Sequence, residues 1–192
     1  MNHFQRIAQG MDIMPLLLAI KRRPELWEKD TFLRDYNQGM PFGCMKTIFL
    51  RWPVIEDGSK MSEDDIKEYM ASDRQHENID RSEYKLLTEA RPLVMNLMHY
   101  VGGERLGRVM INKLEPGGSI TPHADTPAHA EYYSRFHLVL QSSPGVVFRA
   151  GDEETYMETG SWYWFNNKEV HSVINNSAND RIHLIADIRT SR

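Results

Sequence analysis

The sequence between residues 105 and 188 consists of short β-prone segments, in which apolar and polar residues tend to alternate, separated by turn-forming residues. Strands of this length and spacing, with no helical stretch between them, are typical of a β-sandwich or a β-barrel. We therefore expect a mainly β protein with about eight strands in this region, at residues 108–114, 119–123, 135–141, 146–150, 154–157, 161–166, 171–175 and 181–188.

The first hundred residues have a different pattern. Residues 1–42 are predicted to be helical and irregular, because three prolines interrupt any longer helix. Residues 45–52 are predicted to form a strand. Ser62 is expected to cap a helix with an acidic first turn, and residues 86–98 repeat apolar side chains at helical spacing. We expect these N-terminal helices to buttress one sheet.

Composition limits the class of protein. A chain of 192 residues is expected to form one domain, and a net charge of −4 gives no reason to expect a nucleic acid or an anionic membrane as a partner. The only cysteine, Cys44, cannot form an internal disulfide, which fits a reducing compartment. The apolar run at 13–20 is too short to cross a bilayer, and its basic cluster follows it, unlike that of a signal peptide. We expect a cytoplasmic protein.

Three residues in the β-rich region are candidate metal ligands. His123 and Asp125 are two residues apart, so on an extended strand their side chains project from the same face. His171 follows in a second strand-like segment. Two histidines and one carboxylate form the facial triad of non-haem Fe(II) oxygenases, which leaves coordination positions open for a co-substrate and O2.

An arginine accompanies this triad. Arg181 stands ten residues after His171, beyond the turn at 175–180. A hairpin of that length brings the guanidinium back beside the metal, where its planar fork can bind a carboxylate through two hydrogen bonds. Triad and arginine together predict a dioxygenase that uses Fe(II), 2-oxoglutarate and O2.

Four separate segments resemble the aspartyl/asparaginyl β-hydroxylase family. They are Pro-Gly-Gly-Ser-Ile-Thr-Pro-His at 116–123, Arg-Phe-His-Leu-Val-Leu at 135–140, Trp-Phe-Asn-Asn at 164–167, and His171 followed by Arg181. The resemblance covers about residues 105–188. It implies a double-stranded β-helix at 105–192, and hydroxylation of an unactivated carbon with release of succinate and CO2. The part before it, residues 1–104, is expected from its own sequence to be mostly helical.

The resemblance also implies roles for individual residues. The two histidines of the triad match the iron ligands of the family, and Arg181 matches the arginine that binds the distal carboxylate of 2-oxoglutarate. Arg135 and His137 match positions near the other carboxylate of the co-substrate, at the metal end. Asn112 stands where the animal enzyme has a serine that also contacts the co-substrate. Asp125 stands where that enzyme has glycine, so this chain retains the complete triad.

The substrate side is less defined by the sequence. Arg108 occupies a position near the substrate in the family, and Arg149 is a second candidate for substrate binding. The segment 126–134 is longer than in the animal enzyme; we expect its His129 to be exposed to solvent. His183 shares strand parity with Arg181 and is expected to support the site without binding the metal. The expected substrate is an amino acid or a peptidyl Asp/Asn-type side chain.

Two other classes of function remain open. The same scaffold could serve a 2-oxoglutarate oxygenase that modifies a nucleic acid or another small metabolite, although the acidic net charge counts against nucleic acid. A non-enzymatic, cupin-like metal-binding protein is the third class. It gives no reason for an arginine to accompany an intact triad, and release of succinate from 2-oxoglutarate would separate it from the first two.

Overall fold

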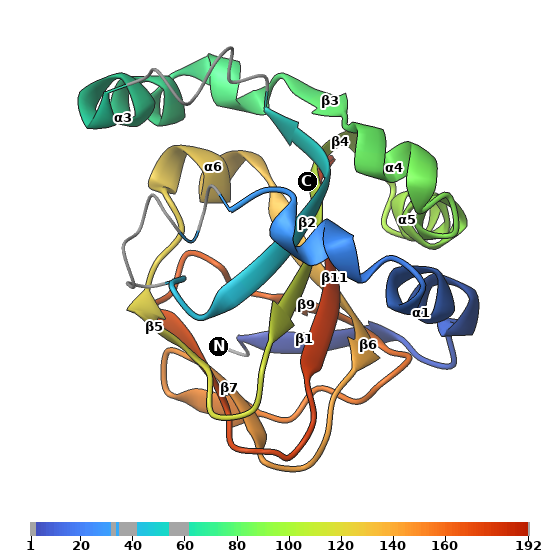
Figure 1. The fold of residues 1–192 in the computed structure, drawn as a ribbon. Coiled ribbons are helices and arrows are strands. Elements are labelled where there is room, and N and C mark those ends of the chain that lie inside the picture. Colours follow the sequence, from blue (N-terminus) through green and yellow to red (C-terminus); the bar gives the residue numbers. More distant parts are fainter. Residues whose placement is uncertain (1–2, 32–33, 35–41, 54–61, 192) are drawn as a thin grey trace.

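A computed structural model describes residues 3–31, 34, 42–53 and 62–191, which form two antiparallel sheets flanked by helices (Figure 1). The larger sheet has seven strands among these residues and the smaller sheet four, in the orders β1-β9-β6-β11-β4-β2-β3 and β5-β10-β7-β8. A shared apolar cluster that includes Val139 and Phe165 of the larger sheet and Phe148 and Val173 of the smaller one packs the sheets face to face. This architecture confirms the expected double-stranded β-helix.

The expected strands of the β-rich region are present. Three match residue for residue: β5 Ser119–His123, β7 Val146–Ala150 and β10 His171–Asn175. The others differ by a few residues at their ends, and β4 begins five residues earlier than expected; they are β4 Gly103–Leu114, β6 Ser134–Gln141, β8 Glu153–Thr155, β9 Trp162–Phe165 and β11 Arg181–Thr190.

The N-terminal part contributes strands as well as helices. The expected strand at 45–52 is β2 Met45–Pro53, and β3 Asn78–Asp80 pairs with it at the edge of the larger sheet. The sequence pattern gave no indication of β1 Phe4–Ala8, which pairs with β9 at the opposite edge. Residues 1–42 are therefore not simply helical, because their first described segment completes the sheet.

The helices begin where local sequence favours them. Ser62 and Asp65 form the reciprocal hydrogen bonds of a capping box at the start of α3 Glu63–Ala71, as expected from Ser62. The predicted helix at 86–98 is instead two helices, α4 Ser82–Leu86 and α5 Ala90–Tyr100. The remaining helical segments are α1 Met14–Lys21, α6 Pro127–Tyr132 and the 3-10 helices η1 Pro24–Glu28 and η3 Asp73–His76. None of the helices in the described part of the chain is long and apolar enough to cross a membrane.

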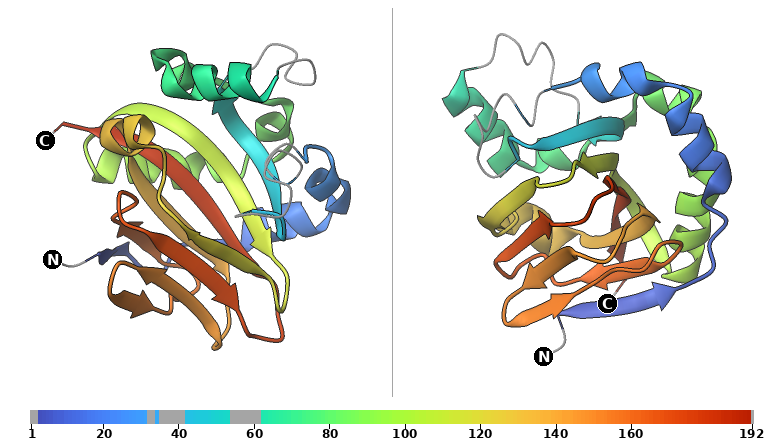
Figure 2. Two further views of the ribbon diagram at one scale, coloured as in Figure 1. Left: turned by 90° about the vertical axis from the view of Figure 1, so that its left-hand side faces the viewer. Right: turned by 60° about the horizontal axis from the view of Figure 1, so that its bottom comes forward.

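The side chains of β11 alternate between two environments, one on each face of the larger sheet. Its side chains at 182, 184, 186 and 188 belong to the apolar cluster that also holds Leu16 and Ile20 of α1 and Val94 and Leu97 of α5. The side chains at 181, 183, 185 and 187 have the opposite parity and line the space between the sheets. Figure 2 shows α1 and α5 on the outer side of the larger sheet, as the prediction of buttressing helices requires.

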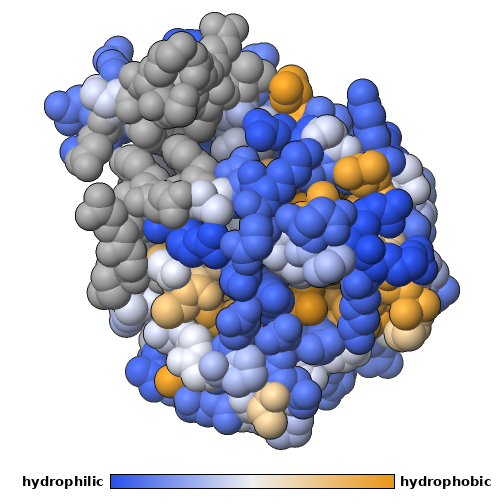
Figure 3. Space-filling view, viewed as in Figure 1, coloured by the Kyte–Doolittle hydropathy of each residue, from blue (hydrophilic) through white to orange (hydrophobic). Residues whose placement is uncertain are grey.

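The aromatic residues of β9 follow the same rule. Trp162 and Trp164 pack in the outer cluster with the helices, whereas Tyr163 and Phe165 pack in the cluster between the sheets. On the face shown in Figure 3, the described residues are mostly polar at the surface, with apolar side chains in separate patches.

Candidate active site

The predicted metal ligands meet at one end of the smaller sheet. His171, the first residue of β10, is the register partner of His123, the last residue of β5, and their rings lie 4.3 Å apart. Asp125 follows two residues later, just beyond the end of the strand. The candidate ligand atoms of the three side chains all lie within 4.8 Å of one another. These residues could therefore hold one metal ion together.

Hydrogen bonds fix the orientation of both histidine rings. His123 Nδ1 lies 2.8 Å from the carbonyl oxygen of Thr121, and His171 Nδ1 lies 2.9 Å from that of Glu169. A carbonyl oxygen only accepts, so each Nδ1 carries a proton and Nε2 is the nitrogen left to bind a metal. Burial lowers the pKa of His171 to about 4, against the attraction of Asp125, so its ring is neutral at pH 7. Both rings thus present Nε2 as a metal ligand.

The Asp125 carboxylate is held by two donors on one of its oxygens. Arg135 Nη1 lies 2.7 Å from Oδ2, and Asn167 Nδ2 donates to the same oxygen at 2.9 Å. Burial raises the pKa of Asp125, but the charge of Arg135 and the hydrogen bond from Asn167 outweigh it, and the net pKa is lowered. The carboxylate is therefore ionised, and Oδ1 is left for a cation. Two imidazoles and one carboxylate fit Fe(II) with positions open for a co-substrate and O2.

Arg181, the first residue of β11, is a buried cation with 1% of its surface exposed. The turn before it is fastened by Asn175, whose Nδ2 donates to the carbonyl oxygens of Leu114 and Asn179 at 2.9 Å. Arg181 Nη2 donates to His183 Nδ1 at 3.0 Å, but the guanidinium has no carboxylate partner among the described residues, and Nε has no partner there either. Burial lowers its pKa to about 9. A buried cation in this state is costly unless a ligand supplies the anion.

A row of buried polar atoms lies on the strands next to Arg181. Thr47, Asn112 and His183 are register partners across β2, β4 and β11. Thr47 Oγ1, Asn112 Oδ1 and His183 Nε2 have no hydrogen-bond partner in the described part of the chain. Because Arg181 can only donate, His183 Nδ1 is the acceptor and Nε2 carries the proton. His137 Nδ1 lies 3.2 Å from that same His183 Nδ1, so it donates and its own buried Nε2 is left without a partner. These open hydrogen-bonding atoms suit a polar ligand.

Aromatic rings connect the metal site with Arg181. The ring of Phe148 lies 5.7 Å from the guanidinium of Arg181 and 6.2 Å from the ring of His171. His137 packs beside it, with ring centroids 5.6 Å from Phe148 and 5.1 Å from Phe165. A short dicarboxylate could therefore reach from the metal along this wall to Arg181, with its chain in apolar surroundings. The residues present fit both the metal and 2-oxoglutarate.

Arg135 is bracketed by two acidic residues. Besides Asp125, it binds the fully buried Asp187 through Nε at 2.7 Å and Nη2 at 2.9 Å. Burial opposes the charge of Arg135, but both carboxylates outweigh it and raise its pKa. The structure thus places Arg135 next to the metal site, as expected, with its donors directed to protein carboxylates.

The two candidate substrate-binding arginines lie in different places. Arg108 is 7% exposed, its guanidinium lies 4.8 Å from the ring of Trp52, and its Nη2 donates to Gln75 Oε1 at 3.4 Å. Burial lowers the pKa of Arg108 to about 10, so it is charged at pH 7. Arg149 instead projects from the outer face of β7, is exposed, and pairs with Glu154. The structure therefore brings Arg108 into the interior and leaves Arg149 outside it.

The expectation that His129, in the 126–134 segment, is exposed to solvent is wrong. His129 is 1% exposed, because α6 turns it inward and its Nε2 lies 2.8 Å from Asp187 Oδ2. Burial lowers the pKa of His129 to about 4. His183 is buried beside Arg181, as expected.

Four side chains near the site were not singled out from the sequence: Thr47, Gln75, Asn167 and Asp187. The sequence could have pointed to Asp187, because it has the same strand parity as Arg181 and so faces the same side of the strand. The sequence could also have pointed to Asn167, since it ends the Trp-Phe-Asn-Asn segment that resembles the family. Gln75 and Thr47 come from the N-terminal part, where neither spacing nor resemblance pointed to the interior.

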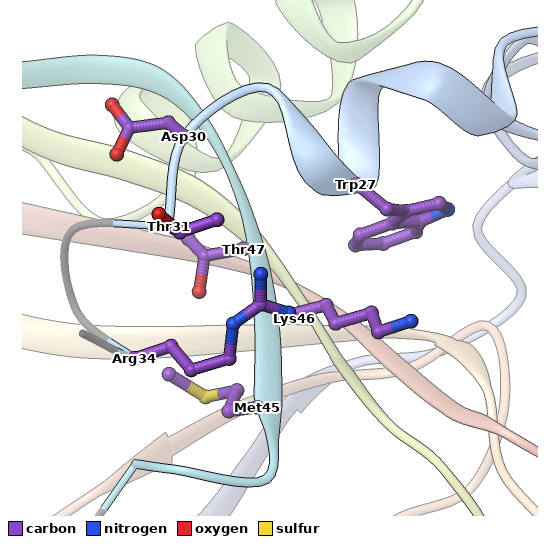
Figure 4. A pocket seen from close by; sticks show the side chains of 7 residues that line it. All are labelled: Trp27, Asp30, Thr31, Arg34, Met45, Lys46 and Thr47. Atoms are coloured by element: carbon purple, nitrogen blue, oxygen red, sulfur yellow. The ribbon is translucent and has the colours of Figure 1, made fainter. Parts of the chain in front are cut away.

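A crevice at the surface lies apart from the triad. It is lined by Trp27, Asp30, Thr31, Arg34, Met45, Lys46 and Thr47 (Figure 4). Its walls come from η1, from the segment after it and from the first half of β2. None of the three candidate metal ligands lines it, so it is not the candidate active site.

Three solved structures are similar to this chain along most of its length. A viral collagen prolyl hydroxylase from Paramecium bursaria Chlorella virus-1, in complex with 2OG, is similar over 100% of this chain and 97% of its own, with 10% identity and a TM-score of 0.51. A Pseudomonas putida prolyl-4-hydroxylase covers 99% and 94% of the two chains, at 16% identity and a TM-score of 0.43. A 2OG-Fe(II) oxygenase-family oxidoreductase from Burkholderia pseudomallei covers 91% and 89%, at 12% identity and a TM-score of 0.45.

A search of curated proteins found no match. The family model of aspartyl/asparaginyl beta-hydroxylase, by contrast, matches residues 53–191, which is well over half of the chain. That span contains the triad, Arg181 and all of the strands from β4 onward. Membership of this family confirms a hydroxylase of the class that uses Fe(II), 2-oxoglutarate and O2. The chain belongs to the aspartyl/asparaginyl β-hydroxylase family.

Proposed function

We propose that this protein hydroxylates an amino acid or a peptidyl Asp/Asn-type side chain at the site formed by His123, Asp125 and His171. The observation that carries the proposal is the buried Arg181, a cation without an acidic partner among the described residues, joined to the triad by an aromatic wall. A merely structural arginine would be paired or exposed. An arginine in this state indicates that the site is completed by a carboxylate from a ligand.

Each group has a defined task in this proposal. With the cofactors bound, O2 oxidises 2-oxoglutarate to succinate and CO2, and one oxygen atom enters the C–H bond of the substrate. The triad would hold the cation and leave positions for the co-substrate and O2. Arg181 orients the distal carboxylate, and Thr47, Asn112 and His183 offer further hydrogen bonds along that end of the interior. Phe148, with its neighbouring rings, excludes water from the path between the two ends.

The substrate side is marked by Arg108. Next to it lie Gln75, whose Nε2 is buried without a partner among the described residues, and an apolar cluster of Phe49, Trp52, Met110 and Ile185. A buried guanidinium and a buried amide donor recognise carboxylate or amide oxygens. These groups support a substrate with a carboxylate or amide near the carbon that is hydroxylated.

A panel of free amino acids and of short peptides containing Asp or Asn tests the proposal. Incubation with Fe(II), 2-oxoglutarate and O2 should give succinate together with a product heavier by one oxygen atom. The variant Arg108→Ala should raise KM for that substrate and leave 2-oxoglutarate binding unchanged, whereas Arg149→Ala should match wild type. Turnover of an unrelated small metabolite alone would support a different oxygenase on this scaffold, and absence of any succinate, coupled or uncoupled, would indicate a protein that only binds metal.

A further inference from the structure

A chain of buried hydrogen bonds behind the metal site joins Asp125 to Arg135 of β6, Asp187 of β11 and His129 of α6. Asp125 Oδ2 accepts from Arg135 Nη1 at 2.7 Å, and Arg135 then binds both oxygens of Asp187 at 2.7 and 2.9 Å. Asp187 Oδ2 also receives His129 Nε2 at 2.8 Å. These side chains are between 0% and 13% exposed. The chain runs from the candidate metal ligand to His129 of α6.

The chemistry of each side chain decides which group donates and which accepts in these hydrogen bonds. Arg135 only donates, and Asp187 is ionised because Arg135 and His129 outweigh the effect of burial and lower its pKa. His129 must therefore donate from Nε2, and its Nδ1 is the bare nitrogen, which has no partner in the described part of the chain. Arg135 is held between two carboxylates and cannot turn toward either of them without breaking bonds to the other. Asp187 thus restrains Arg135, and His129 restrains Asp187.

We propose that Asp187 and His129 are positioning residues that act through Arg135 to hold the Asp125 carboxylate with Oδ2 turned to the protein and Oδ1 turned to the metal. Without the restraint, Arg135 can swing over and bind Asp125 through both of its oxygens, and it then competes with the cation for Oδ1. This inference also gives α6 a task, because the helix carries His129 and directly follows Asp125 in the chain. It rests on the proposal that the triad is the metal site.

Mn(II) affinity, measured by electron paramagnetic resonance or calorimetry without substrate, tests the inference apart from activity. Binding by the wild-type protein tests the triad itself. His129→Phe keeps a ring of similar size and removes the donor, and it leaves the charge unchanged because His129 is neutral at pH 7. We expect Mn(II) binding to weaken about 10- to 100-fold, as is usual when a partner of a metal ligand is lost. The matched control is His99→Phe on the exposed face of α5, which should bind Mn(II) as wild type does.

Two further comparisons separate positioning from general damage to the fold. His129→Gln places an amide donor near the position of Nε2 and should recover most of the affinity, whereas His129→Asn is too short and should not. In an Asp125→Gly background, His129→Phe should have no further effect on Mn(II) binding, because the residue through which it acts is gone. The inference is overturned if His129→Phe binds Mn(II) within twofold of wild type. If that variant does not fold, equal affinity of the Gln and Asn variants overturns it instead.

Discussion

Replacing Arg181 by methionine should weaken 2-oxoglutarate binding and stabilise the ligand-free protein at the same time. The first effect follows from the lost bidentate pair: leaving the distal carboxylate of the co-substrate buried and unpaired costs on the order of 2–5 kcal/mol. At about 1.4 kcal/mol per tenfold, this is roughly a thirtyfold to several-thousandfold loss of affinity. Arg181→Lys should recover only part of it, because an ammonium group cannot reproduce the planar fork.

The second effect follows from the missing acidic partner. Burial lowers the pKa of Arg181 from 12.5 to about 9, and at about 1.36 kcal/mol per pKa unit the charged form is destabilised by roughly 5 kcal/mol in the folded protein. The penalty for this cation is complete at pH values below 9 and is relieved as the pH rises through that value. Methionine fills most of the space without a charge, so we expect a gain of about 1–4 kcal/mol at neutral pH. For a chain of this length, each kcal/mol raises Tm by about 2–4 °C.

Two measurements on one pair of proteins check both effects. Calorimetric titration of 2-oxoglutarate into the Mn(II)-loaded proteins gives the affinities, and thermal unfolding without ligand gives the stabilities. Asn175→Ala is a useful comparison, because it loosens the same hairpin and should lower stability. If Arg181 merely closes the hairpin, Arg181→Met should lower the stability slightly and leave the affinity for 2-oxoglutarate unchanged. Near-wild-type affinity in Arg181→Met would refute the carboxylate role.

Three further predictions concern the triad and the buried histidines. Anaerobic addition of Fe(II) and 2-oxoglutarate should give a weak visible charge-transfer band in wild type and none in His171→Ala; an unchanged band would remove His171 from the ligands. Asp125→Gly should weaken Fe(II) binding but leave some turnover, and unaltered iron affinity would exclude Asp125 as a ligand. Stability should fall as the pH is lowered from 7 to 5.5, because His129 and His171 have pKa values of about 4 when folded and about 6.5 when unfolded, so unfolding takes up protons. Each contributes about 1 kcal/mol over that range in urea titrations, and a stability independent of pH there would contradict their burial as neutral rings.

The chemistry of the site was more predictable from the sequence than its surroundings. The i, i+2 spacing and the later histidine predicted the metal cluster, because strand parity makes that spacing informative without knowledge of the fold. The register that sets His123 opposite His171 is a tertiary property, and the sequence shows only that both lie in strands. The spacing from His171 singled out Arg181, and the resemblance then implied its role toward the distal carboxylate of 2-oxoglutarate.

The features that were predicted wrongly share a physical cause, because they depend on partners that are distant in the sequence. His129 seemed to lie in a polar loop, and it is buried because Asp187, 58 residues away, accepts its hydrogen bond. β1 alternates poorly and was taken as irregular, yet β9 offers it a free sheet edge. The helix expected at 86–98 was extended too far toward its N-terminus, where Leu86 is exposed and the chain turns between α4 and α5.

The alternation along β11 also bears on how this enzyme can change. Residues 182, 184, 186 and 188 face the helices and carry the cohesion of the outer core, whereas 181, 183, 185 and 187 face the interior where ligands would bind. A library that varies the odd positions would therefore act mainly on ligand binding, and one that varies the even positions would act mainly on the packing of the outer core. Arg181 is the exception, because its replacement is expected to change co-substrate affinity and stability together.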